Sequence, residues 1–108
     1  MINIKNKTAV ILSVSLMIVS PAAFALDGAE LYKTKTCYTC HGKDGKTPIL
    51  PSYPKIAGQN EAYSLQQMKD IKSGARSNGM SAGMKGIMHL VNDEEMEALA
   101  GYIATMAP

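Results

Sequence analysis

The stretch CYTCH at residues 37–41 constrains this chain more than any other feature. It holds the only two cysteines of the 108 residues, and a histidine follows the second one directly. Close cysteine pairs serve three chemistries in proteins: redox dithiols, zinc sites and covalent attachment of haem. The rest of the sequence has to discriminate between them.

Zinc and dithiol chemistry fit the remaining residues poorly. A structural zinc ion needs about four ligands, and residues 26–108 offer only Cys37, Cys40, His41 and His89, without a second cysteine pair. A thioredoxin-like dithiol begins a helix within a βαβ unit, whereas this pair follows a predicted helix in a region without strand patterns. Both chemistries remain as minor alternatives.

Haem attachment requires what is present, since C-x-x-C-H is the signature of c-type haem. Cys37 and Cys40 are spaced to add to the two vinyl groups of the porphyrin, and His41 then lies under the iron as its proximal ligand. The sequence therefore predicts one covalent haem c, bound through both cysteines.

The first 25 residues have the pattern of a secretory signal peptide. Lys5 and Lys7 precede a mostly apolar run at residues 9–19, and the small-residue cleavage pattern Ala-Phe-Ala ends at Ala25. The run is shorter than the ~20 residues that span a bilayer, although an uncleaved anchor is the alternative. We expect a domain at residues 26–108 with no membrane span, located in the periplasm, because this haem attachment occurs outside the bacterial cytoplasm.

Charge and length narrow the function further. Without Lys5 and Lys7, the 11 Lys and Arg fall to 9 and equal the 9 Asp and Glu, so nothing favours a nucleic-acid partner. A domain this short buries only about 60% of its unfolded surface. A large apolar cofactor would supply the missing core.

The domain is predicted to be all-α. Asp27 with Glu30 and Asn92 with Glu95 have the spacing of capping boxes, and Asn60 is a third N-cap. These caps predict helices ending near residues 36, 106 and 73, respectively. The last helix should bury Met96, Leu99, Ala100 and Ile103.

Two long segments are predicted to be loops. Residues 42–59 hold three prolines and three glycines, a composition that disfavours regular structure. Residues 75–91 contain three internal glycines, each costing roughly 1 kcal/mol in a helix. We expect a loop there whose Met80, Met84 and Met88 face inward. Methionine, His89 and lysine are candidates for the sixth iron ligand, and methionine sulfur favours Fe(II).

Taken together, these motifs resemble the class I c-type cytochromes of the short single-haem bacterial type, and also one half of the two-haem periplasmic members. The resemblance extends from about Asp27 to Met106. It rests on Gly28 with Tyr32, CYTCHG, YPKIAGQ at 53–59, KSGARSN at 72–78 and LAGYI at 99–103. It implies a class I cytochrome c fold, with three main helices and loops wrapping one haem. The first and last helices should cross at Gly28, with Tyr32 and Tyr102 packed there.

The resemblance also implies roles for single residues. The family's axial methionine lies seven residues before the hydrophobic position that precedes the last helix. That position is Val91 here, so the resemblance selects Met84. Met80 is the second choice, followed by Met88 or by no methionine ligand. His89 is expected to be exposed. A carbonyl of the proline loop should orient His41, with Pro48 preferred and Pro51 possible. Arg76 is placed near a haem propionate, or alternatively in solvent.

We therefore expect a monomeric electron carrier, not an enzyme, that cycles between Fe(II) and Fe(III) with redox proteins as donor and acceptor. Exposed lysines near the haem edge would form a docking patch, or serve only solubility: Lys33, Lys35, Lys43 and Lys46. The alternatives are a haem subunit of a larger redox complex, or a five-coordinate haem enzyme or gas sensor.

Overall fold

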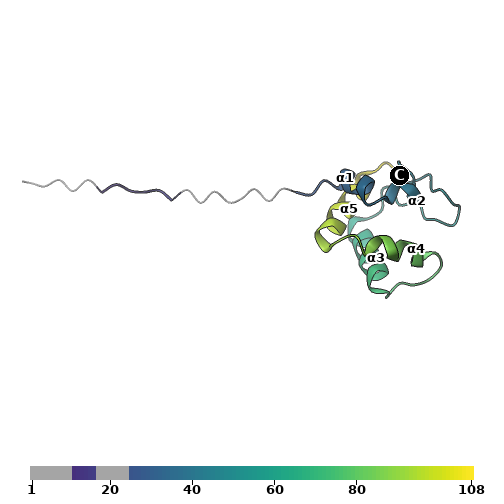
Figure 1. The fold of residues 1–108 in the computed structure, drawn as a ribbon. Helices are drawn as coiled ribbons and strands as arrows, with labels where there is room; N and C mark the ends of the chain where they lie inside the picture. Colours follow the sequence, from purple (N-terminus) through teal and green to yellow (C-terminus); the bar gives the residue numbers. More distant parts are fainter. Residues whose placement is uncertain (1–10, 17–24) are drawn as a thin grey trace, which may run out of the picture.

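The computed structural model describes residues 11–16 and 25–108, and five α-helices lie in the second range (Figure 1). They are α1 (Gly28–Thr34), α2 (Cys37–His41), α3 (Glu61–Ser73), α4 (Ser81–Met88) and α5 (Asp93–Thr105). No strand occurs in the described ranges, and the predicted all-α fold is confirmed. Most of the predicted signal peptide lies outside the described residues; residues 11–16 are exposed and have no regular secondary structure.

All three predicted N-caps are confirmed. The Asp27 carboxylate accepts hydrogen bonds from the N–H groups of Ala29 and Glu30, and the Asn60 side chain accepts one from Tyr63. At α5, the side chain of Asn92 and that of Glu95 each bind the other's backbone N–H, which confirms the capping box predicted there. The capping box predicted at Asp27 is only half formed, because the described residues show no bond from the Glu30 side chain back to the Asp27 N–H. Side chains that satisfy free N–H groups explain where these helices begin.

The crossing of α1 and α5 depends on a glycine, as predicted. A Cβ atom on Gly28 would lie 2.3 Å from the Ala98 carbonyl oxygen and 2.7 Å from the Tyr102 Cβ, so no larger residue fits without movement. The rings of Tyr32 and Tyr102 pack edge to face with centroids 5.6 Å apart. The two ends of the domain therefore lie in direct contact, as Figure 1 shows.

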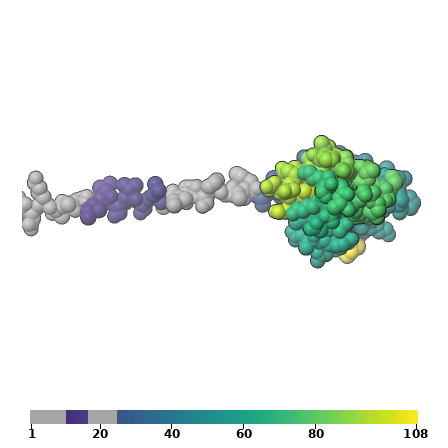
Figure 2. Space-filling model, turned by 90° about the horizontal axis from the view of Figure 1, so that it is seen from below, coloured from purple at the N-terminus to yellow at the C-terminus, as the bar shows by residue number. Residues whose placement is uncertain are grey.

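The core lies between α1, α3 and α5. Met96, Leu99, Ala100 and Ile103 are buried, which confirms the predicted face of α5. Tyr32, Met68, Ile71, Met88 and Val91 complete it. Figure 2 shows α3, α4 and α5 side by side on one face of the domain. Within the described residues, no helix is long and apolar enough to cross a membrane.

The prediction of a loop throughout residues 75–91 is wrong, because residues 81–88 form α4. Gly79 does precede the helix, in a left-handed conformation with φ of 56°. Met88 is only 1% exposed, and α4 packs along α3. This tertiary packing outweighs the cost of Gly83 and Gly86, a reversal that propensities alone do not capture.

Candidate functional site

Helix α2 brings the cysteine pair and the histidine to one side. In a helix, residues three and four positions apart are neighbours, so Cys37, Cys40 and His41 all line a single cavity of about 430 Å³. Both cysteines are free thiols. Burial is the main reason that the pKa of the Cys37 thiol is raised to about 11, so this thiol stays protonated near neutral pH.

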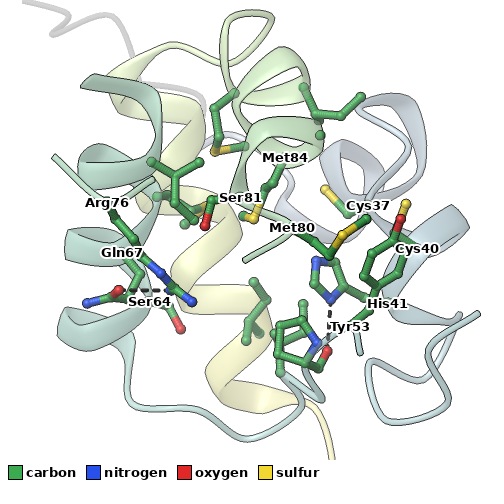
Figure 3. Close-up of a pocket in the computed structure, with 18 of the residues that line it drawn as sticks. Cys37, Cys40, His41, Tyr53, Ser64, Gln67, Arg76, Met80, Ser81 and Met84 are labelled. Carbon is green, nitrogen blue, oxygen red and sulfur yellow. Dashed lines mark hydrogen bonds between the residues drawn. The ribbon is translucent and has the colours of Figure 1, made fainter. Parts of the chain in front are cut away.

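The His41 ring is oriented by the loop beneath it. His41 is 8% exposed, and its Nδ1 lies 3.0 Å from the carbonyl oxygen of Pro54 (Figure 3). Because a carbonyl oxygen only accepts, this contact requires the proton on Nδ1, so Nε2 is the nitrogen that is available to a metal. When one ring nitrogen of a histidine binds a metal, a carbonyl oxygen that accepts from the other ring nitrogen fixes the tautomer and the orientation of the ring.

The predicted acceptors for His41 are therefore wrong: the carbonyl belongs to Pro54, and not to Pro48 or Pro51. The loop folds back on itself, since the N–H of Ile49 binds the Cys40 carbonyl and the N–H of Ile56 binds that of Gly45. These bonds carry the end of the loop under the imidazole. Pro48 is half-buried but does not contribute to the cavity wall.

The three methionines of the glycine-rich segment all reach the cavity, from the side formed by α4. Met84 is half-buried and packs against the core, whereas Met80 is 54% exposed and Met88 is almost fully buried. Figure 3 shows Met80 and Met84 beside the cavity that Cys37 and His41 also border. His89, in contrast, is exposed and lies outside the cavity wall, as predicted.

Arg76 also borders the cavity. Its Nη1 donates to Oε1 of Gln67 at 2.9 Å and its Nε donates to Oδ1 of Asn78 at 3.3 Å. Within the described ranges it forms no ion pair with a carboxylate. Two neutral amides therefore hold the guanidinium in place without neutralising its charge.

Three polar residues of the cavity wall were not predicted from the sequence: Ser64, Gln67 and Ser81. Ser64 and Ser81 are each 8% exposed and border the cavity. Gln67 lies on α3, as Ser64 does, and accepts the hydrogen bond from Arg76. A signal existed for Ser64, because it precedes buried Met68 by four residues and so shares its helix face. A polar residue on an otherwise apolar stripe indicates that the stripe borders something other than plain core.

The residues fit a haem c. Two thiols and an imidazole come from one helix, thioethers from another, and an unneutralised guanidinium borders the same apolar cavity. Among residues 11–16 and 25–108, no three His, Cys, Asp or Glu side chains come together as a site for a free metal ion. The fold and the site together define a c-type cytochrome.

Comparison with known proteins agrees. The profile of the family described as Cytochrome c matches residues 25–107, and the chain belongs to this family. It is similar to cytochrome c4 of Pseudomonas aeruginosa, with 39% identity over 93% of this chain and 48% of the relative. It is also similar to a thiosulfate dehydrogenase electron acceptor of Stutzerimonas stutzeri, with 35% identity over 86% of this chain and 45% of the relative.

The fold comparison gives the same answer. The crystal structure of reduced recombinant cytochrome c4 from Pseudomonas stutzeri superposes with a TM-score of 0.66 and 30% identity, covering 74% of this chain and 46% of that one. The chain spans about half the length of these relatives. The predicted family and the covalent haem c at Cys37 and Cys40 are thereby confirmed.

Proposed function

We propose that this chain is a periplasmic electron carrier whose haem iron is bound by His41 and Met84. The observation that carries the proposal is the shared cavity, to which α2 supplies His41 and α4 supplies Met84. The haem, when bound, supplies the one-electron Fe(II)/Fe(III) couple. The residues of the chain supply its orientation, its ligands and its exclusion from water.

Burial favours Met84 over Met80 as the axial thioether. Met84 packs against the hydrophobic core, while more than half of the Met80 surface is exposed. A side chain already restricted by packing loses less conformational entropy when it becomes a ligand. Thioether sulfur favours Fe(II). The contact between His41 Nδ1 and the Pro54 carbonyl orients the ring, whose other nitrogen would bind the iron.

The apolar cavity wall would keep solvent away from a bound iron. Ile71, Leu99 and Ile103 are buried apolar residues that border it. His41 and Met84 together would leave the iron no open coordination position, and the packed apolar wall would limit rearrangement between redox states. Arg76, held by Gln67 and Asn78 at the cavity wall, would bind a haem propionate through its free charge.

Delivery and partners follow from the remaining residues. Residues 1–25 act as the signal peptide and residues 26–108 as a monomeric haem domain.

The proposed docking patch is formed by exposed lysines. Lys33 and Lys43 border one surface hollow beside exposed Tyr38, and Lys46 is exposed nearby in sequence. Lys35 no longer belongs to this docking patch, because it binds Glu95 and the Leu90 carbonyl. A relative named as an electron acceptor of a dehydrogenase supports redox proteins as partners.

Two measurements test the proposal. The product secreted with a haem-maturation system should have, under denaturing conditions, the mass of residues 26–108 plus one haem. The oxidised protein should show the weak near-infrared sulfur-to-iron band, and the reduced protein should not bind carbon monoxide at neutral pH. A bare polypeptide mass would refute haem attachment, and rapid carbon monoxide binding would favour the five-coordinate enzyme or sensor.

Substitution assigns the ligand. Met84→Leu should abolish the near-infrared band and admit carbon monoxide, because leucine offers no sulfur. Met80→Leu is the matched control and should retain the band. The opposite pattern would transfer the axial role to Met80.

A further inference from the structure

Helix α4, which carries Met84, has little intrinsic stability. It is eight residues long, contains two glycines and has no side-chain N-cap. Its backbone lies close to that of α3 and to no other described helix. Short helices with internal glycine depend on tertiary contacts for their position.

Two lysines from other helices hold the chain where α4 ends. Lys35, the C-cap of α1, donates from Nζ to the Leu90 carbonyl at 2.7 Å. Lys72, in the last turn of α3, donates to the Val91 carbonyl at 2.5 Å. The N–H groups of Leu90 and Val91 still bind back into α4, so these carbonyls lie at its negative, C-terminal end, where cations stabilise a helix.

A carboxylate links the Lys35 ammonium group to α5. Oε2 of Glu95 lies 3.3 Å from the Lys35 Nζ, and its Oε1 accepts the N–H of Asn92 at 3.0 Å. The pKa of Glu95 is held below its usual range, chiefly by the Asn92 N–H and further by Lys35 and the nearby charge of Lys72. Residues 90–92 are thus bound on several sides, by groups from α1, α3 and α5.

We propose that this lysine clamp, formed by Lys35, Lys72 and Glu95, positions the axial methionine. The clamp fixes the C-terminal end of α4 to three helices, and Met84 lies within that helix. Loosening the end of α4 frees the thioether to leave the iron without unfolding the domain. Lys35 and Lys72 are accordingly positioning residues. The inference rests on the proposed ligation by His41 and Met84.

Imidazole binding to the oxidised holo-protein measures this effect, since imidazole has to displace the thioether. Lys35→Met and Lys72→Met keep a long apolar stem and remove the ammonium. Each should tighten imidazole binding about tenfold, which corresponds to ~1.4 kcal/mol, and weaken the near-infrared band. Lys72→Arg retains the cation and should restore most of the wild-type affinity.

Two controls separate positioning from general stability. Lys69→Met removes another lysine of α3, an exposed one, and should leave imidazole binding unchanged. Asp27→Ala removes the N-cap of α1, at the opposite end of that helix from Lys35, and lowers overall stability without removing a clamp residue; it too should leave imidazole binding unchanged.

An unchanged imidazole affinity in the double variant Lys35→Met/Lys72→Met would overturn the clamp. So would an equal gain in affinity from Asp27→Ala. A wild-type protein without the near-infrared band would instead refute the methionine ligation itself, which separates the two failures.

Discussion

Replacing Gly28 with alanine tests the contact that joins the two ends of the domain. The new Cβ would lie 2.3 Å from the Ala98 carbonyl oxygen, so α1 and α5 have to separate by ~1 Å, enough to forfeit a quarter to a half of the dispersion energy at the contact. Overpacking of this kind costs ~1–3 kcal/mol. The edge-to-face pair of Tyr32 and Tyr102 loses part of a further ~0.5–1.5 kcal/mol.

Alanine also brings a gain, because glycine in a helix is less favourable by ~0.5–1 kcal/mol. The net expectation is a loss of about 2 kcal/mol, or a decrease in Tm of about 8–16 °C for a domain of this size. Guanidinium chloride unfolding of the holo-protein, followed by far-ultraviolet circular dichroism, measures it.

Gly86→Ala is the matched control. Nothing lies within 4 Å of the Cβ that alanine would add on this residue of α4. It should therefore stabilise the protein by ~0.5–1 kcal/mol. If Gly28→Ala proved as stable as the wild type, or if both variants shifted in the same direction, the crossing would not depend on the missing side chain.

Two further predictions concern hydrogen bonds. Asn92→Ala removes the acceptor for the Glu95 N–H and should lower the free energy of unfolding by ~1 kcal/mol, whereas Asn92→Asp should retain most of it; an unchanged midpoint for alanine would contradict the cap. Tyr32→Phe removes the bond from the Tyr32 hydroxyl to the Gly42 carbonyl and should cost about 1 kcal/mol at neutral pH. Burial raises the pKa of Tyr32 from 10.0 to about 12, so the unfolded chain loses this proton first and wild-type stability should fall as pH rises between these values; the phenylalanine variant should lack this part of the decline.

The helix starts were predictable because their determinants are local. Asp27, Asn60 and Asn92 each bind an N–H two or three residues ahead, so the spacing of side chains in the sequence is sufficient. The cysteine pair and His41 were equally accessible, since one helical turn holds all three. The crossing at Gly28 was a long-range feature, and only the resemblance to a family supplied it.

The misses share a cause, namely contacts between distant residues. Helix α4 forms because Met88 enters the core and α3 lies alongside, and neither fact is written in residues 81–88 themselves. Lys35 looked like a free surface charge, yet its partner Leu90 is 55 positions away. The carbonyl that orients His41 was wrongly predicted to be that of Pro48, because backbone carbonyls are chemically alike and no residue type marks the one at Pro54.

The direct contact of α1 with α5 has a consequence for the order of assembly. A polypeptide that emerges from its amino end presents α1 first and α5 last, so the pairing at Gly28 waits until the whole domain has been delivered. Contacts between such remote segments form late. Until then CYTCH stays accessible, and its sulfurs can react before folding covers Cys37. We therefore expect the prosthetic group to be attached to the open chain, before the two ends close.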